Sequence, residues 1–240
     1  LFQILKMNLY KLQEKFLKDM HNAGSKNIVR LVIVGLFIVT LTNGQSLTSD
    51  TILIQDLDFE ILYSQVLEQP LVVEYDVKCP SSGVSRSGMG FYGTKVLVTS
   101  DYRDYSDNIY DKGHCIPAAS FDCNETLLRK TFSYINCALQ HEKLNRTTWK
   151  YLEEFERELA ESEKVHVRII IDFNTIRRLP SNAAVPTGFY KEISTSKRRL
   201  CFFFPNDQPI SKDIMDYKCT CRSNINIQES FPVVFFSTFN

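Results

Sequence analysis

The stretch Tyr110-Asp111-Lys112-Gly113-His114 places an imidazole directly after a glycine, where a strand can end with the His114 side chain facing a cleft. A second stretch, Leu144-Asn145-Arg146-Thr147-Thr148-Trp149-Lys150-Tyr151-Leu152-Glu153, begins as a polar turn and predicts a helix over 145–160. Its apolar side chains recur at close to the 3.6-residue period of a helix that packs on a core: Trp149, Leu152, Phe155 and Leu159. We interpret the rest of the chain outward from these two stretches.

Asn145 opens the predicted helix, and Glu153 follows eight residues later. The two side chains are expected about 80° apart around the helix and ~12 Å apart along it, so both could line one groove. An amide oxygen, a carboxylate and a histidine from a neighbouring strand are groups that a hydrated Mg²⁺ ion and a water nucleophile need. Asn is also a favoured N-cap residue, so Asn145 has a purely structural alternative.

Several short elements of this region follow one another in a recognisable order: Asp111-Lys112-Gly113-His114, Pro117-Ala118-Ala119, Asn136 with Gln140, and residues 144–153. In order and separation this series resembles the DNA/RNA non-specific endonucleases with the ββα-metal finger, relatives of endonuclease G. The resemblance covers roughly residues 72–236. The family motif usually reads Asp-Arg-Gly-His, so Lys112 is a departure from it.

The resemblance implies an α+β fold, in which a ββα-metal finger accompanies a central antiparallel sheet flanked by helices. It also implies metal-dependent hydrolysis of the phosphodiester bonds of DNA and RNA, with little sequence preference. His114 would act as the general base. One Mg²⁺ (or Mn²⁺) ion would be bound directly by Asn145 and, through water, by Glu153.

The resemblance implies two further site residues. Asn136 would support the site by hydrogen bonding. An arginine upstream of the histidine motif would contact the scissile phosphate, and Arg86 fits best by position, with Arg103 as the alternative. For either arginine, a plain surface position is the competing interpretation.

The remaining pattern predicts a mixed α+β domain whose helices pack on a central antiparallel sheet. A helix is predicted within 121–135. Short β-branched and apolar runs bounded by turn residues predict the strands: 50–58, 71–77, 165–173, 199–204, 217–227 and 233–236.

The chain has 240 residues, of which 44% are hydrophobic, and this suits one domain, expected over 45–240, with a short extension. Residues 1–44 contain six Lys/Arg and two Asp/Glu, so the remainder carries 22 positive and 26 negative side chains, a net charge of −4. A protein that held nucleic acid by bulk charge would be basic. Binding of nucleic acid must therefore rest on the metal and on local positive charge, for example Arg86, Arg177-Arg178 or Lys197-Arg198-Arg199. In the alternative interpretation, the last two clusters are solvated loops.

The N-terminal residues have the layout of a secretory signal peptide. Lys26 and Arg30 precede the apolar run 31–41, and small residues follow up to Gly44. This run is well short of the ~20 residues that span a bilayer. We therefore expect residues 1–44 to be an N-terminal extension and signal peptide cleaved near Gly44, and the protein to be secreted without stable membrane association; a membrane anchor is the alternative.

Secretion changes the interpretation of the seven cysteines. In an oxidising compartment we expect up to three disulfides with one thiol left over, and the sequence does not specify the pairing. A zinc site is the alternative. Against zinc, Cys219-Thr220-Cys221 has only one residue between its cysteines, and no matching CxxC occurs elsewhere.

Two segments, Asn124-Glu125-Thr126 and Asn145-Arg146-Thr147, match the N-glycosylation acceptor pattern. A glycan on Asn145 would block metal binding. We therefore predict that Asn145 is unmodified, and that Asn124 is the modified site if either is.

Two other functions remain open. Lys112 and the sequence Asp172-Phe173-Asn174, where the family commonly has a Gly-Pro turn, leave room for a secreted homologue that binds nucleic acid with weak or no catalysis. A disulfide-rich interaction protein is the second alternative, in which His114, Asn145 and Glu153 would be present by coincidence. A homodimer is common in the family, although no motif of this chain indicates one.

Overall fold

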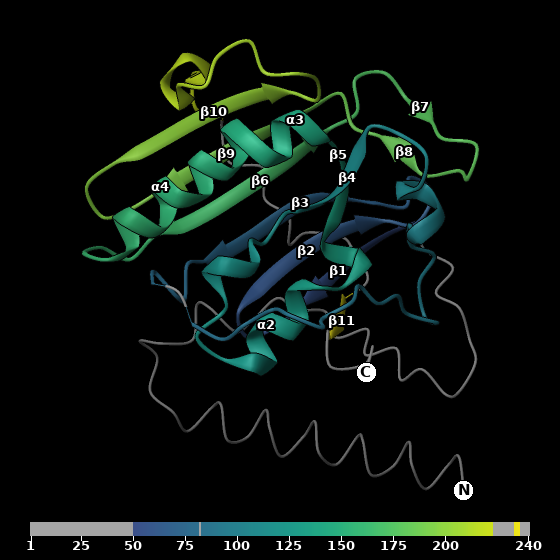
Figure 1. The fold of residues 1–240 in the computed structure, drawn as a ribbon, viewed down its shortest axis with the longest axis horizontal. Coiled ribbons are helices and arrows are strands. Elements are labelled where there is room, and N and C mark those ends of the chain that lie inside the picture. The colour runs from purple at the N-terminus through teal and green to yellow at the C-terminus, as the bar shows by residue number, and fades with distance from the viewer. Residues whose placement is uncertain (1–49, 82, 223–232, 236–240) are drawn as a thin grey trace, which may run out of the picture. The chain divides into compact units, whose positions relative to one another are not determined.

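A seven-stranded sheet forms the centre of the part of the chain that the computed structural model describes, residues 50–81, 83–222 and 233–235 (Figure 1). Every neighbouring pair of strands is antiparallel except β1 and β11, which are parallel. The predicted central antiparallel sheet is therefore confirmed. In spatial order the strands are β10 (Arg199–Pro205), β9 (Gly188–Ser194), β6 (His166–Asp172), β3 (Gln69–Asp76), β2 (Phe59–Ser64), β1 (Thr51–Gln55) and β11 (Val233–Phe235).

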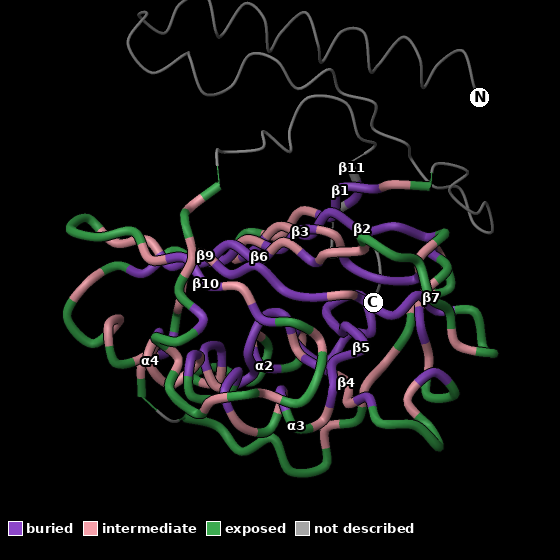
Figure 2. The backbone as a smooth tube through the Cα atoms, turned by 90° about the horizontal axis from the view of Figure 1, so that it is seen from above, coloured by how far each residue is buried: buried purple, intermediate pink, exposed green. Residues whose placement is uncertain are grey.

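The other elements are two short strand pairs, the helices and several 3-10 turns. One pair is β4 (Tyr110–His114) with β5 (Cys137–His141), and the other is β7 (Arg177–Arg178) with β8 (Ala184–Val185). Figure 2 shows the helices and the β4–β5 pair on one side of the sheet. The helices are α2 (Glu125–Thr131), α3 (Glu142–Leu144) and α4 (Lys150–Ala160); 3-10 turns span Tyr102–Tyr105, Ala118–Ser120, Tyr134–Asn136 and Ile214–Tyr217.

Alternation along the strands explains why one face of the sheet is covered. In β6, Val167, Ile169 and Ile171 are buried. His166, the first residue of this strand, is exposed. Side chains of alternate strand residues point to opposite faces, so this pattern gives the sheet one mainly apolar face. The core between that face and the helices includes Ile54, Ile61, Val73, Phe189, Phe202, Phe204, Leu144, Trp149 and Leu152.

The helix predicted within 121–135 is α2, and one predicted strand differs from the structure. Asn124 caps α2: its Oδ1 accepts a hydrogen bond of 2.8 Å from the Thr126 N–H. The strand predicted over 217–227 is absent from its described part, where residues 218–222 contribute a single bridge from Lys218 to Phe202. Residues 223–227 and the predicted signal peptide lie outside the described residues.

The cysteines form two disulfides, fewer than the upper bound expected from the sequence. Cys79 pairs with Cys123, and Cys201 pairs with Cys221. The free thiols are Cys115, Cys137 and Cys219, the first two of them buried. Within the described ranges, no group of three or more His, Cys, Asp or Glu side chains is placed to hold a metal ion, and Cys221 of the Cys219-Thr220-Cys221 segment is in a disulfide. No described helix is both long enough and apolar enough to cross a membrane.

Candidate active site

A β-hairpin followed directly by a helix holds most of the predicted site residues. In the β4–β5 pair, Asp111 lies opposite Gln140 and His114 lies opposite Cys137. From β5 the chain enters a continuous helical run over Glu142–Ala160. Gly113 permits the close packing of the hairpin, because a Cβ at this position would lie 2.6 Å from the Cβ of Gln140.

The helix begins three residues earlier than the sequence predicted. The Nδ1 atom of His141 accepts a hydrogen bond of 3.1 Å from the backbone N–H of Lys143 and caps the helix. Asn145 is therefore not the N-cap, which removes the structural alternative for it. Instead, Asn145–Trp149 form a π-helical turn between α3 and α4. Such turns are rare inside helices and are frequent at functional sites.

Asp111 orients the Asn145 side chain. Its Oδ2 accepts a hydrogen bond of 2.9 Å from the Asn145 Nδ2, and Arg146 donates to both oxygens of the same carboxylate at 2.9 and 2.7 Å. Burial raises the pKa of Asp111, but the hydrogen bonds from Arg146 and Asn145 outweigh burial and hold the pKa below its usual 3.8. Because the amide nitrogen faces Asp111, the amide oxygen faces away from this carboxylate.

His114 lies at the end of β4 between two aromatic rings. Its ring centroid is 5.0 Å from that of Phe91 and 5.2 Å from that of Phe132, and its buried Nε2 has no hydrogen-bond partner among the described residues. Burial, with the charge of Arg86 added to it, lowers the pKa of His114 from 6.5 to about 4. The imidazole is therefore neutral at neutral pH, with a lone pair available to accept a proton.

The two candidate arginines lie in different environments. Arg86 is exposed, acts electrostatically on His114, and makes no side-chain hydrogen bond or ion pair with the other described residues. Arg103 is tied to Asp101 by hydrogen bonds of 3.1 and 3.0 Å from its Nε to the two carboxylate oxygens. Of the two, only Arg86 combines proximity to His114 with an uncommitted guanidinium group.

Asn136 is buried, and its side chain bonds only to backbone. Its Oδ1 accepts from the N–H of Ile116 at 2.8 Å, while its Nδ2 donates to the carbonyls of Ile116 and Thr131 at 3.0 and 2.9 Å. These bonds fix the segment that directly follows His114. The structure therefore places Asn136 as a support of the strand end rather than in a position to touch a substrate.

Glu153 lies on α4, where burial raises the pKa of its carboxyl group from 4.5 to about 7. The charge of Glu156 adds to the rise, whereas Lys191 and Arg157 oppose it. Glu153 and Lys191 also act on the thiol of Cys115, the residue after His114, whose pKa burial raises to about 12. Glu153 is thus electrostatically coupled to the end of β4.

Three buried polar residues that the sequence analysis missed lie near Glu153. The Lys191 Nζ is 2.5 Å from the Glu156 Oε1, and the Tyr75 hydroxyl donates to the Glu156 Oε2 at 2.7 Å. A signal for Lys191 was present, since it occupies the inward position between Phe189 and Ile193 in β9. Glu156 likewise interrupts the apolar side of the predicted helix.

The site offers suitable groups for a hydrated divalent ion. Among the described residues none donates a hydrogen bond to the amide oxygen of Asn145, and both polar side-chain atoms of Gln140 are buried without a partner. Oxygen ligands and retained waters are what Mg²⁺ prefers. The donor set therefore fits an ion held by one amide oxygen and by water.

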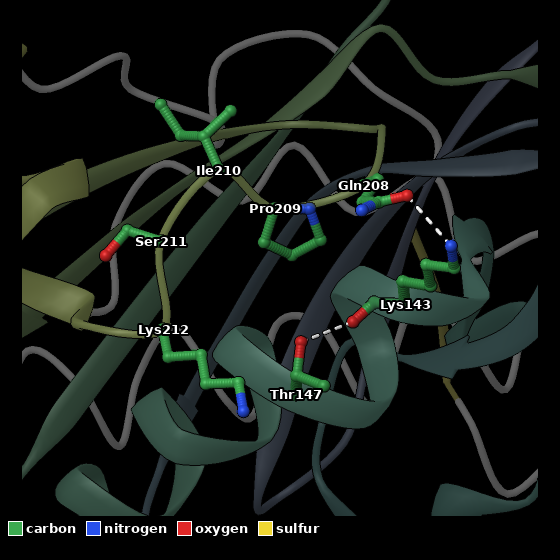
Figure 3. Close-up of a pocket in the computed structure, with 7 residues that line it drawn as sticks. All are labelled: Lys143, Thr147, Gln208, Pro209, Ile210, Ser211 and Lys212. Carbon is green, nitrogen blue, oxygen red and sulfur yellow. Dashed lines mark hydrogen bonds between the residues drawn. The ribbon is translucent and has the colours of Figure 1, made fainter.

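A shallow pocket of about 310 Å³ lies beside the same helix but does not belong to the site (Figure 3). It lies between Lys143, Thr147 and the loop 208–212, where Lys143 donates to the Gln208 Oε1 at 2.8 Å. Asn145 is two residues from both Lys143 and Thr147, and helix residues at that spacing do not face the same side.

Comparisons with known proteins identify the family and the fold of the chain. The sequence profile of the DNA/RNA non-specific endonucleases matches residues 40–237. "Nuclease 1, mitochondrial" of Schizosaccharomyces pombe (strain 972 / ATCC 24843) is 31% identical to this chain over 111 residues. The match covers 39% of this chain and 34% of that protein, so it spans about a third of the relative. The solved structure of EndoG in the EndoG/EndoGI complex superposes with a TM-score of 0.62 at 22% identity, over 70% of this chain and 80% of that one, and shows the same fold. The chain belongs to the DNA/RNA non-specific endonuclease family.

Proposed function

We propose that residues 45–240 form a metal-dependent endonuclease that hydrolyses phosphodiester bonds of DNA and RNA with little sequence preference. The observation that carries this proposal is the Asn145 amide, which donates a 2.9 Å hydrogen bond to Asp111 in β4, the strand that ends in His114. An oriented amide oxygen and a neutral imidazole on one ββα unit are the two groups that this reaction needs from the chain.

In this mechanism His114 accepts the proton of the attacking water. The water oxygen forms a bond to phosphorus, and the bond from phosphorus to the 3′ oxygen breaks. A pKa of about 4 makes the free imidazole a weak base, but an anionic phosphate beside it favours the protonated form and raises its basicity when substrate binds. Phe91 and Phe132 hold the ring in place and restrict its contact with bulk water.

Asn145 would bind a Mg²⁺ or Mn²⁺ ion directly, and Glu153 would hold one of its water molecules. When bound, the ion supplies charge stabilisation of the phosphorane-like transition state and of the leaving oxygen. A nearby cation favours the ionised form of Glu153, whose pKa of about 7 in the isolated chain leaves it partly protonated.

Arg86 would contact the scissile phosphate, while Asn136 fixes the backbone after His114. Contacts to phosphate carry no base information, so we expect little sequence preference. A homodimer remains part of the proposal on the ground of family resemblance alone.

We also propose that the protein is secreted after cleavage near Gly44. Two disulfides support an oxidising compartment. N-terminal sequencing of the mature chain tests this, and an uncleaved N-terminus on a membrane-bound chain would support the anchor alternative.

The activity is tested by incubating the purified mature chain with plasmid DNA and with RNA, with and without EDTA. We expect metal-dependent degradation of both substrates, reduced by ~10²–10⁴-fold in His114→Ala, the range typical of general acid–base catalysis. His166→Ala is the matched control, since His166 is exposed on β6 and contacts Asp76. Binding without cleavage by the wild-type chain would instead identify the inactive nucleic-acid-binding homologue.

A further inference from the structure

A lysine is fully buried beneath the site. Lys191 in β9 and Glu156 in α4 both have side chains that are 0% exposed, and their charged atoms lie 2.5 Å apart. The Tyr75 hydroxyl from β3 donates to the other Glu156 oxygen at 2.7 Å. The Lys191 ammonium also lies 4.3 Å from the ring centroid of Trp149, at a distance typical of a cation–π contact.

The two helix residues that Lys191 contacts lie on either side of Glu153. Trp149 precedes Glu153 by four residues and Glu156 follows it by three, and these spacings place all three side chains on one side of the helix. Lys191 itself is held between two strands, where it lies opposite Ile169 in β6 and Phe202 in the edge strand β10. A side chain anchored in the sheet therefore contacts the helix one turn before and one turn after the Glu153 carboxylate.

Stability alone does not explain this arrangement. Two charges lose their hydration when they are buried, so a buried ion pair is often no more stable than apolar residues of the same volume. The neighbouring inward positions of β9, Phe189 and Ile193, are apolar and pack well in the same core. What the Lys191–Glu156 ion pair adds, with the hydrogen bond from Tyr75 to Glu156, is a constraint on the position and rotation of the helix relative to the sheet.

We propose that Lys191, through Glu156 and Trp149, is a positioning residue that fixes the turn of α4 on which Glu153 lies, so that the Glu153 carboxylate can hold a metal-bound water. This inference rests on the proposed function. Groups that orient a metal site from outside its direct ligands commonly change metal affinity or activity by ~10–100-fold when they are lost. A shift of the helix by a fraction of an ångström is enough for such an effect.

The decisive variant removes the polar cluster as a unit. Lys191→Met alone leaves Glu156 buried without a counter-charge and is expected to melt at a much lower temperature. Lys191→Met/Glu156→Leu/Tyr75→Phe, the apolar variant, leaves no unpaired group and should melt within a few degrees of the wild type. Lys150→Met is the matched control, because Lys150 lies on the same helix, on its exposed side, near Glu154.

Two measurements separate positioning from folding. Isothermal titration of the nucleic-acid-free protein with Mn²⁺ reports metal affinity without requiring activity, and steady-state kinetics report kcat and KM. We expect the apolar variant to bind Mn²⁺ ~10–100-fold more weakly and to lose kcat by a similar factor. KM for nucleic acid should change by less than about threefold, because the proposed phosphate contacts lie elsewhere in the site. The Lys150→Met protein should match the wild type in all three.

A folded apolar variant with wild-type Mn²⁺ affinity and kcat would overturn the positioning role and leave the proposed nuclease function intact. If the apolar variant does not fold, Tyr75→Phe decides the question: a several-fold weaker Mn²⁺ affinity supports the inference, and an unchanged affinity overturns it. A wild-type chain that binds Mn²⁺ but does not cleave would refute the proposed function while the titration still tests Lys191. A wild-type chain that binds no Mn²⁺ overturns both.

Discussion

Replacing Asp111 by alanine tests the orientation of the Asn145 amide, which we propose binds the metal ion. The change removes the acceptor of one hydrogen bond from Asn145 and of two from Arg146. The Arg146 side chain is 62% exposed, so its ion pair contributes only ~0.2–1 kcal/mol to the free energy of unfolding. The bond from the partly buried Asn145 to a charged acceptor contributes about 1.5 kcal/mol, at the low end for such bonds.

The two contributions have different consequences. Together they predict a loss of about 2 kcal/mol in the free energy of unfolding, or roughly 4–8 °C in Tm for a domain of this size. The 1.5 kcal/mol that orients the Asn145 amide corresponds to about a tenfold change in an equilibrium constant. We therefore expect Asp111→Ala to raise the Mg²⁺ concentration for half-maximal cleavage by about tenfold.

The assay is cleavage of plasmid DNA across a Mg²⁺ titration, with thermal unfolding measured on the same samples. Asp101→Ala is the matched control, since Asp101 forms a similar two-oxygen contact with Arg103. It should lower Tm to a comparable extent without altering the Mg²⁺ dependence. A folded Asp111→Ala protein with a wild-type Mg²⁺ requirement would show that Asp111 does not orient Asn145 for metal binding.

Three further predictions concern stability and cysteine pairing. Burial raises the pKa of Asp58, but its two lysine partners outweigh burial and hold it below 3.8, so its stabilising effect is present above pH 3.8 and is lost as the pH falls through the lowered value. Asp58→Asn should therefore lower Tm by roughly 2–4 °C at pH 7, and the difference from the wild type should vanish at strongly acidic pH; a difference that persists there would contradict this. Gly113→Ala should reduce both Tm and cleavage, because its Cβ would lie 2.5 Å from the Gln140 Oε1, and wild-type values for both would exclude the close packing of the hairpin. Cys79→Ser should reduce the free energy of unfolding by ~4 kcal/mol, since its disulfide spans 44 residues, whereas Cys219→Ser should leave denaturant unfolding unchanged; a destabilised Cys219→Ser protein would mean that the pairing differs.

Short-range patterns predicted much of the fold. The inward-facing apolar residues of 165–173 and 199–204 correspond to β6 and β10, which lie on either side of β9. These predictions succeeded because the burial of one face of a strand or helix makes apolar residues alternate, or recur with the helical period, along the local sequence. The family, too, could be identified from short elements whose order and separation match those of the nucleases.

Boundaries depended on individual side chains and were less predictable. The helix that carries Asn145 and Glu153 starts at Glu142 because the His141 ring caps it, and a histidine is not among the usual capping residues. The π-helical turn at Asn145–Trp149 has no period of its own that a pattern could reveal. The helix predicted within 121–135 lies inside that range, but its first residue was not specified by the pattern and follows from the Asn124 cap.

Residue types and spacing are enough to locate an imidazole, an amide and a carboxylate with the chemistry of a hydrated metal site, and to place them on a strand end and a helix. They cannot show that Asp111 turns the Asn145 amide, which cysteines pair, or that Lys191 is buried against Glu156. Those contacts join residues 20 or more positions apart, and they form only when packing of the whole core brings particular backbones to within a few ångströms of one another.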